Sequence, residues 1–172
     1  MKPNIFLTGF MGTGKTTVGK KIADLTGMKF HDLDRLIEET AGLSISEIFK
    51  EKGEPWFRRL ESKLLIEISE KKNIVLATGG GVVLNPVNRN KMKSSGVVVA
   101  LTASLETIWE RLKEDTYRPL LNGENPRKLM EELYKQRASI YSDAHVIVSV
   151  DGKSPLLLAK EILHIIDEKN KY

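Results

Sequence analysis

The clearest chemical signal in the sequence is the segment GFMGTGKT at positions 9–16. It matches the pattern G-x-x-x-x-G-K-[ST] of nucleoside triphosphate-binding loops at every fixed position. Gly12 and Gly14 allow the backbone to turn its N–H groups toward phosphate oxygens, and the helix that follows adds positive charge at its N-terminus. Lys15 would reach the β- and γ-phosphates, and the hydroxyl of Thr16 would ligate Mg²⁺. The segment therefore predicts binding of a nucleoside triphosphate.

A dinucleotide site is the alternative interpretation of this glycine-rich turn. Acidic residues, Asp32 and Asp34, follow the turn by about 20 residues, as they do in dinucleotide-binding folds. The pattern G-x-G-x-x-G, however, needs a third glycine at position 17, where Thr17 stands. It also leaves Lys15 and Thr16 unexplained, so the triphosphate interpretation is favoured.

Two aspartates lie at the end of the second expected strand. Asp32 is its last residue, Asp34 comes two residues later, and each has two interpretations. The third expected strand ends without the acidic residue that usually helps to hold Mg²⁺ in such proteins. Asp32 is the nearest substitute and would act through water, although a strand-ending aspartate is equally well explained as a helix cap. Asp34 would accept a proton from an attacking hydroxyl or orient that hydroxyl, and it too would serve as a cap.

Two arginines indicate an anionic phosphate acceptor. Arg137 falls on the apolar stripe of its expected helix, and a buried charge must find a partner. That partner would be a carboxylate of the protein, such as Glu61, or a carboxylate of a ligand. Arg58 lies beside another apolar stripe, with Glu61 one turn later as a partner. The glycines at positions 79–81 follow the third strand and expose bare backbone to a ligand in the expected crevice.

Residues 113–125, KEDTYRPLLNGEN, are polar and lie between two expected helices, as a mobile lid would. Arg118 in this segment would swing over the transferring phosphate. Arg111 would stack on an adenine ring and Pro155 would press on its other side. From spacing alone, a solvated arginine and a helix-starting proline are the favoured explanations of these last two residues.

Short apolar runs alternate with helical patterns along the chain. We expect strands at 5–8, 29–32, 74–77, 97–101 and 146–150. The expected helices lie at 16–25, 45–49, 55–68, 105–112, 126–141 and 155–167, and a capping box at Ser44–Glu47 begins the second of them. Residues 33–61 would form a helical insertion between the second and third strands. This alternation predicts a single α/β domain over residues 1–172, with a parallel sheet covered on both faces.

The 172-residue chain has 27 Lys and Arg against 23 Asp and Glu, a net charge of +4, and 41% hydrophobic residues. The basic residues are interspersed with acidic ones and only 6% of residues are aromatic, which disfavours nucleic-acid binding. There is no cysteine, no apolar run of membrane-spanning length, and no signal-peptide core. We therefore expect a cytoplasmic protein without a membrane or nucleic-acid partner.

Taken together, the motifs resemble those of shikimate kinases, in the same order and over essentially the whole chain. They are GFMGTGKTTVG at 9–19, DLD at 32–34, SISEIF at 44–49, FRRLE at 57–61, TGGG at 78–81, RPLL at 118–121 and R-x-x-x-Y at 137–141. The phosphate loop is shared by many nucleotide-binding proteins, whereas the combination of FR-x-x-E, the triple glycine and RPLL is quite specific.

The resemblance implies ATP-dependent phosphorylation of the 3-hydroxyl of shikimate, in the chorismate route to aromatic amino acids. It implies a monomeric three-layer sandwich similar to nucleoside monophosphate kinases, with sheet order 2-3-1-4-5. Asp34, Lys15 and Arg118 would be catalytic, and Thr16 with water-bridged Asp32 would place Mg²⁺. The implied shikimate-binding residues are Asp34, Arg58, Gly79, Gly80, Gly81 and Arg137. The implied ATP-binding residues are Gly12, Thr13, Gly14, Lys15, Thr16, Thr17, Arg111, Arg118 and Pro155.

Other functions remain open at the level of sequence. A kinase for gluconate or for a nucleoside monophosphate would use the same phosphate loop and would also recruit arginines. A non-catalytic P-loop module that regulates or binds nucleic acid is a third possibility. Such a module predicts nucleic-acid binding with a steep salt dependence, and it leaves Asp34 and the lid unexplained.

Overall fold

Five parallel strands form one sheet in the order β2-β3-β1-β4-β5. The strands are β1 (Asn4–Gly9), β2 (Lys29–Asp32), β3 (Ile74–Ala77), β4 (Gly96–Thr102) and β5 (Val146–Ser149). The computed structural model describes residues 3–113 and 124–169, and everything below concerns these residues. The sheet order and the five predicted strands are confirmed, with strand ends that shift by at most one residue.

The central position of β1 follows from its residues. All six of them are buried, and β1 pairs with β3 on one side and with β4 on the other. A continuous apolar run suits a parallel strand that is covered on both faces. At the edge of the sheet, β5 instead alternates between buried and exposed positions, and Ile147 remains 53% exposed.

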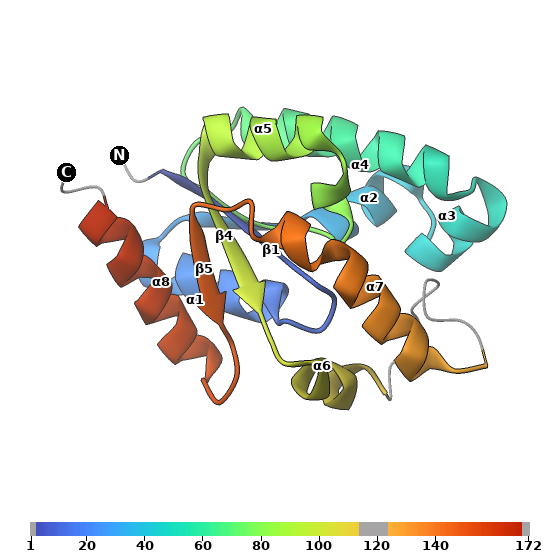
Figure 1. Cartoon of the computed structure of the whole chain (residues 1–172). Coiled ribbons are helices and arrows are strands. Elements are labelled where there is room, and N and C mark those ends of the chain that lie inside the picture. The colour runs from blue at the N-terminus through green and yellow to red at the C-terminus, as the bar shows by residue number, and fades with distance from the viewer. Residues whose placement is uncertain (1–2, 114–123, 170–172) are drawn as a thin grey trace.

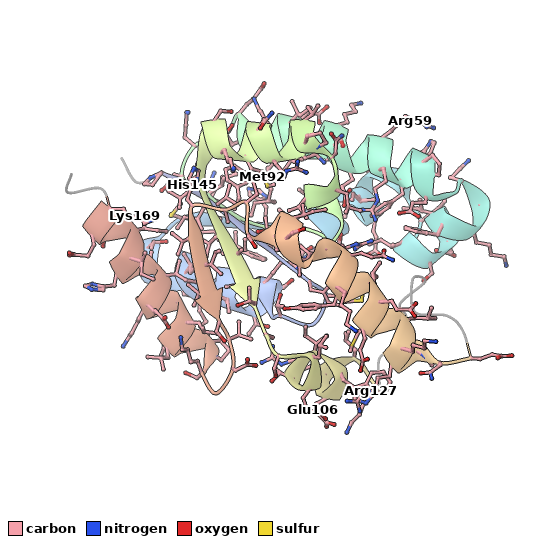
Figure 2. The ribbon with its side chains drawn as sticks, viewed as in Figure 1. Arg59, Met92, Glu106, Arg127, His145 and Lys169 are labelled. Atoms are coloured by element: carbon pink, nitrogen blue, oxygen red, sulfur yellow. The ribbon has the colours of Figure 1, made fainter. Side chains whose placement is uncertain are left out.

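Helices cover both faces of the sheet, as Figure 1 shows. On one face lie α4 (Glu54–Ser69) and α5 (Pro86–Ser95), and on the other lie α1 (Lys15–Thr26) and α8 (Pro155–Lys169). Met92 of α5 is fully buried in the core (Figure 2). The predicted three-layer arrangement is thus confirmed, and it places the carboxyl ends of all five strands at one edge, where ligands bind in such folds.

Three helices follow β2: α2 (Leu33–Ala41), α3 (Ile45–Glu51) and the long α4. The predicted capping box at the start of α3 is present, because Ser44 accepts a hydrogen bond from the Glu47 N–H and the Glu47 carboxylate accepts one from the Ser44 N–H. The rings of Phe49 and Phe57, 5.0 Å apart, pack α3 against α4. This packing fixes the region around one side of the candidate site.

The remaining elements are the short 3₁₀ helix η1 (Val82–Leu84), α6 (Leu105–Leu112) and α7 (Pro126–Tyr141). An ion pair of 2.9 Å joins Arg127 of α7 to Glu106 of α6 (Figure 2). Most of the predicted lid at 113–125, including Arg118, lies outside the described residues. Among the described residues, no helix is both long enough and apolar enough to cross a membrane.

The sequence analysis missed helix α5. Its sequence, PVNRNKMKSS, is largely polar, so no apolar stripe marked it. A local signal was nevertheless present: the side chain of Asn85 caps the helix by accepting a hydrogen bond from the Val87 N–H, and Pro86 occupies the first turn. Only Asn88 and Met92 of this helix are buried.

Candidate active site

The phosphate loop connects the end of β1 to the start of α1. Gly12 and Gly14 have φ angles of 79° and 88°, a left-handed conformation that favours glycine. The Lys15 ammonium folds back over the loop and donates hydrogen bonds to the carbonyl oxygens of Gly9 and Phe10, at 2.8 and 3.0 Å. These carbonyl groups hold the cation over the loop, where phosphate oxygens would bind.

A pocket of about 390 Å³ opens over this loop. Eight of the nine residues that the resemblance assigns to ATP line it: Gly12, Thr13, Gly14, Lys15, Thr16, Thr17, Arg111 and Pro155. The ninth, Arg118, lies outside the described residues. The sequence analysis missed Lys153, which also lines the pocket and forms an ion pair of 2.8 Å with Glu161. Its position two residues before Pro155 was the available signal.

Hydrogen bonds connect the elements that carry Arg111 and Pro155 at this pocket. Arg111 donates to the carbonyl oxygen of Gly12 at 2.9 Å, which links α6 to the phosphate loop. The Asp151 carboxylate, in the turn before α8, accepts a hydrogen bond of 2.9 Å from the Ser104 N–H at the start of α6. Arg111 lies on α6 and Pro155 begins α8, and the hydrogen bond from Ser104 to Asp151 joins these two elements.

Thr16 and Asp32 meet where the phosphate loop faces the end of β2. The Thr16 hydroxyl donates to one Asp32 carboxylate oxygen at 2.6 Å. The other oxygen accepts hydrogen bonds from the N–H groups of Asp34 and Arg35 and so caps α2. Both interpretations of Asp32 are compatible with this geometry, because one oxygen caps the helix while the other faces the pocket.

A second pocket, of about 290 Å³, adjoins the first. All six residues that the resemblance assigns to shikimate line it: Asp34, Arg58, Gly79, Gly80, Gly81 and Arg137. Apolar side chains that the sequence analysis did not assign to the site complete the wall: Met11, Ile45, Phe49 and Phe57. The pocket thus combines cationic groups with an apolar surface. The signal for Ile45 and Phe49 was their place inside the SISEIF motif.

Three residues line both pockets: Met11, Asp34 and Gly80. Asp34 therefore lies at the junction of the two pockets. Its carboxylate lies close to the backbone of Gly79, where an added Cβ atom would come within 2.8 Å of Asp34 Oδ1 and 3.0 Å of Glu61 Oε1. Glycine at position 79 is thus what allows two carboxylates to approach the loop.

An ion pair between partly exposed Arg58 and buried Glu61 lines the second pocket. The Arg58 guanidinium donates two hydrogen bonds to the Glu61 carboxylate, at 2.9 and 3.1 Å, and Glu61 is only 1% exposed. Burial raises the pKa of the Glu61 carboxyl, and the positive charge of Arg58 opposes that rise. Arg137 is also buried, at 6% exposure, as its place on the apolar stripe predicted.

A parallel sheet of this order, a phosphate loop after its central strand and a second pocket that shares an aspartate with the first define a small P-loop kinase. The sequence model of the family "Shikimate kinase" matches residues 11–167. The chain therefore belongs to the shikimate kinase family, as the motifs predicted.

Individual relatives agree with this assignment. The chain is 46% identical to a shikimate kinase of Persephonella marina, over 93% of this chain and 96% of that protein. It is 42% identical to one of Actinobacillus pleuropneumoniae, over 96% of each. Among solved structures, shikimate kinase from Acinetobacter baumannii in complex with shikimate superposes with a TM-score of 0.95 at 40% identity, covering 98% of this chain and 95% of that one. A gluconokinase from Sinorhizobium meliloti, at 19% identity and a TM-score of 0.55, shares the fold alone.

Proposed function

We propose that the chain transfers the γ-phosphate of ATP to the 3-hydroxyl of shikimate, a step toward chorismate and the aromatic amino acids. Membership of the shikimate kinase family supports this activity. The observation that carries the proposal is the position of Asp34, which lines both a phosphate-loop pocket and a pocket with two arginines. Donor and acceptor would meet at this carboxylate.

The second pocket has the chemistry of a small cyclic hydroxy acid. Arg58 and Arg137 offer guanidinium groups to a carboxylate, which they bind with paired hydrogen bonds. Phe49 and Phe57 provide an apolar surface for a carbon ring. The bare backbone at Gly80 allows close approach of the ring to the loop. Gly79 and Gly81 extend this surface.

Asp34 would act on the hydroxyl that attacks the γ-phosphate. A carboxylate at the junction of the two pockets accepts the hydrogen bond of that hydroxyl and directs its oxygen toward the phosphorus. It would also accept the proton as the new bond forms. We propose Asp34 as the catalytic carboxylate on this basis.

The phosphate loop would bind and neutralise the triphosphate. Backbone N–H groups of Gly12 and Gly14 and the N-terminus of α1 would surround the phosphates, and Thr13 lines the same pocket. Lys15 would exchange its loop carbonyl partners for phosphate oxygens and stabilise charge that develops during transfer. We propose that Arg118, in a lid formed by residues 113–125, adds a second cation from above.

The adenine ring would lie at the far end of the first pocket. Arg111 and Pro155 line this pocket, and they would contact the two faces of a planar base. Thr17 completes the nucleotide-binding set on α1.

Thr16 and Asp32 fit a magnesium ion, which usually takes few protein ligands and keeps several waters. The Thr16 hydroxyl and the Asp32 carboxylate, 2.6 Å apart, both line the phosphate pocket and would supply one direct and one water-mediated ligand. When bound there, Mg²⁺ would neutralise charge on the β- and γ-phosphates. Among the described residues, no group of three or more His, Cys, Asp or Glu side chains is placed to hold a metal ion.

We further propose that residues 1–172 act as one cytoplasmic, monomeric kinase domain with residues 33–61 as its substrate-binding insertion. The cysteine-free composition is compatible with a reducing compartment.

The proposal is tested by measuring ADP production from Mg-ATP in the presence of shikimate, gluconate, AMP or no acceptor. We expect sustained turnover with shikimate alone. Turnover with gluconate or AMP instead would agree with ATP binding at the phosphate loop but would refute shikimate as the acceptor. ADP release that no acceptor stimulates would indicate a binding or regulatory module.

A further inference from the structure

Two polar side chains lie one helical turn apart on the buried face of α7. Arg137 and Tyr141 are separated by four residues, so their side chains are neighbours on one face of the helix. Both are buried, with exposed fractions of 6% and 4%. Arg137 lines the second pocket, whereas Tyr141 packs behind it. Tyr141 has no role in the mechanism described above.

The hydroxyl of Tyr141 contacts the triple-glycine loop, and Arg137 lies nearby on the same helix. The phenol O–H donates a hydrogen bond to the carbonyl oxygen of Gly80, and the Arg137 guanidinium interacts electrostatically with the phenol. A carbonyl oxygen can only accept, so the phenol is the donor in this hydrogen bond. Burial raises the pKa of Tyr141 to about 12, so the hydroxyl keeps the proton that it donates at neutral pH.

The position of the Gly80 carbonyl affects the shape of both pockets. Gly80 lines both pockets, and it packs against the phosphate loop closely enough that an added Cβ atom would lie 3.4 Å from the Met11 nitrogen. A run of three glycines has little conformational preference of its own. A hydrogen bond to the Gly80 carbonyl fixes the peptide plane between Gly80 and Gly81, since that bond is planar and trans.

The ring of Tyr141 has a separate anchor. It lies edge-on to Phe10, with ring centroids 6.5 Å apart, and Phe10 also packs edge-on against Tyr134 at 5.4 Å. Aromatic packing of this kind does not require the hydroxyl. The effect of the hydroxyl can therefore be separated from the effect of the ring.

We propose that Tyr141 is a positioning residue for the acceptor. Its hydroxyl holds the Arg137 guanidinium and the Gly80 peptide in one arrangement, and that arrangement receives the carboxylate and ring of the acceptor. This inference rests on the proposed function, because it specifies how the second pocket is kept ready for shikimate.

The direct test is Tyr141→Phe, which removes the hydroxyl and keeps the ring. Tyr134→Phe is the matched control, because Tyr134 lies on the same helix, contacts the same Phe10 ring and donates a 3.4 Å hydrogen bond to the carbonyl of Ala103, away from the second pocket. The measurements are kcat, the KM for shikimate, the KM for ATP and the melting temperature. We expect Tyr141→Phe to raise the KM for shikimate roughly tenfold, as for the loss of one hydrogen bond, and to change the KM for ATP much less.

Equal shikimate KM values for the two phenylalanine variants would overturn the inference. A rise of both KM values together with a fall in melting temperature would also overturn it, because that pattern indicates a hydroxyl with a merely structural role. If the wild-type protein does not turn over shikimate at all, the proposed function fails first and this inference falls with it. Wild-type turnover therefore distinguishes the two failures.

A double-mutant cycle tests the link to Arg137. The four proteins are wild type, Arg137→Lys, Tyr141→Phe and the double variant, all compared by their KM for shikimate. If the hydroxyl acts through Arg137, the double variant resembles Arg137→Lys alone, because the lysine no longer presents the guanidinium that the phenol orients. If the two increases in KM multiply, the residues act independently and the proposed link between the hydroxyl and Arg137 is overturned.

Discussion

The hydroxyl of Thr16 lies 2.6 Å from the carboxylate of Asp32, and the same carboxylate caps helix α2. One side chain thus connects the phosphate loop, the end of β2 and the start of the helix that carries Asp34. Movement of Asp32 would disturb both the proposed metal position and the catalytic carboxylate. The two functions of Asp32 can be separated by choosing the substitution.

Asp32→Ser and Asp32→Ala both remove the negative charge of the carboxylate, but they differ in their ability to cap helix α2. Serine is a good N-cap, whereas alanine is not, so we expect only Asp32→Ala to lose about 1 kcal/mol of stability in urea unfolding. Both variants lack the carboxylate, so both should need more Mg²⁺ for half-maximal activity. A wild-type Mg²⁺ dependence in Asp32→Ser would contradict the metal role.

Asp34→Asn keeps the size of the side chain and removes its negative charge. We expect kcat to fall by roughly 10²–10⁴-fold while calorimetry still detects shikimate binding, because the amide oxygen can still accept a hydrogen bond from the hydroxyl but is a poor base. Glu39→Gln is the control, since Glu39 lies on the same helix and only pairs with exposed Arg35. A fall in kcat no larger than that of the control would remove Asp34 from the chemistry.

The two carboxylate partners of Arg58 should contribute unequally to stability. Glu61 is buried, whereas the side chain of Glu54 is 45% exposed and lies 3.1 Å from the same guanidinium. Glu61→Ala should cost about 2–3 kcal/mol, less than for a fully buried pair because Arg58 is partly exposed. Glu54→Ala should cost about 0–1 kcal/mol. Equal losses in urea unfolding would show that burial of Glu61 does not strengthen the pair.

His145 predicts how stability depends on pH. Its Nδ1 atom accepts a hydrogen bond of 3.0 Å from the Val98 N–H, so the imidazole must keep this nitrogen unprotonated (Figure 2 locates the residue). Burial lowers the pKa of His145 below 6.5, and Lys93 and Lys169 add to this effect. The unfolded chain therefore binds the proton first, and stability present above pH 6.5 is lost as the pH falls through the lowered folded pKa.

This dependence is measured by urea unfolding of the wild type and of His145→Asn at several pH values between 7.5 and 5. We expect a smaller loss of stability on acidification in the variant. His164→Asn is the control, since this histidine lies on α8 and accepts no comparable backbone hydrogen bond among those described. An unchanged slope in His145→Asn would refute the prediction.

The sequence predicted the sheet and the phosphate loop because both are determined locally. Strand β1 is a continuous apolar run buried on both faces, and the loop from Gly9 to Thr16 is contiguous in the chain. The resemblance implied that Thr16 and Asp32 act together, and the structure brings their side chains within 2.6 Å. Helix α5 escaped prediction because its polar sequence buries only two side chains.

Other parts of the site depend on contacts between distant segments. No spacing rule in the sequence specifies these contacts. They are the burial of Glu61, the position of Lys153 in the nucleotide pocket and the hydrogen bond from Tyr141 to Gly80. Motif resemblance placed Arg58 and Arg137 near one ligand, but only the fold shows that Asp34 lines both pockets.

The most direct test of the account is a transfer experiment with ATP labelled in its γ-phosphate. The enzyme is mixed with shikimate and Mg²⁺, and the label is followed by chromatography with the product identified by NMR. The account predicts that the label moves to the 3-oxygen of shikimate in step with ADP formation. Label that appears only in inorganic phosphate, or on an acceptor other than shikimate, would contradict the claim that the two pockets meet for this transfer.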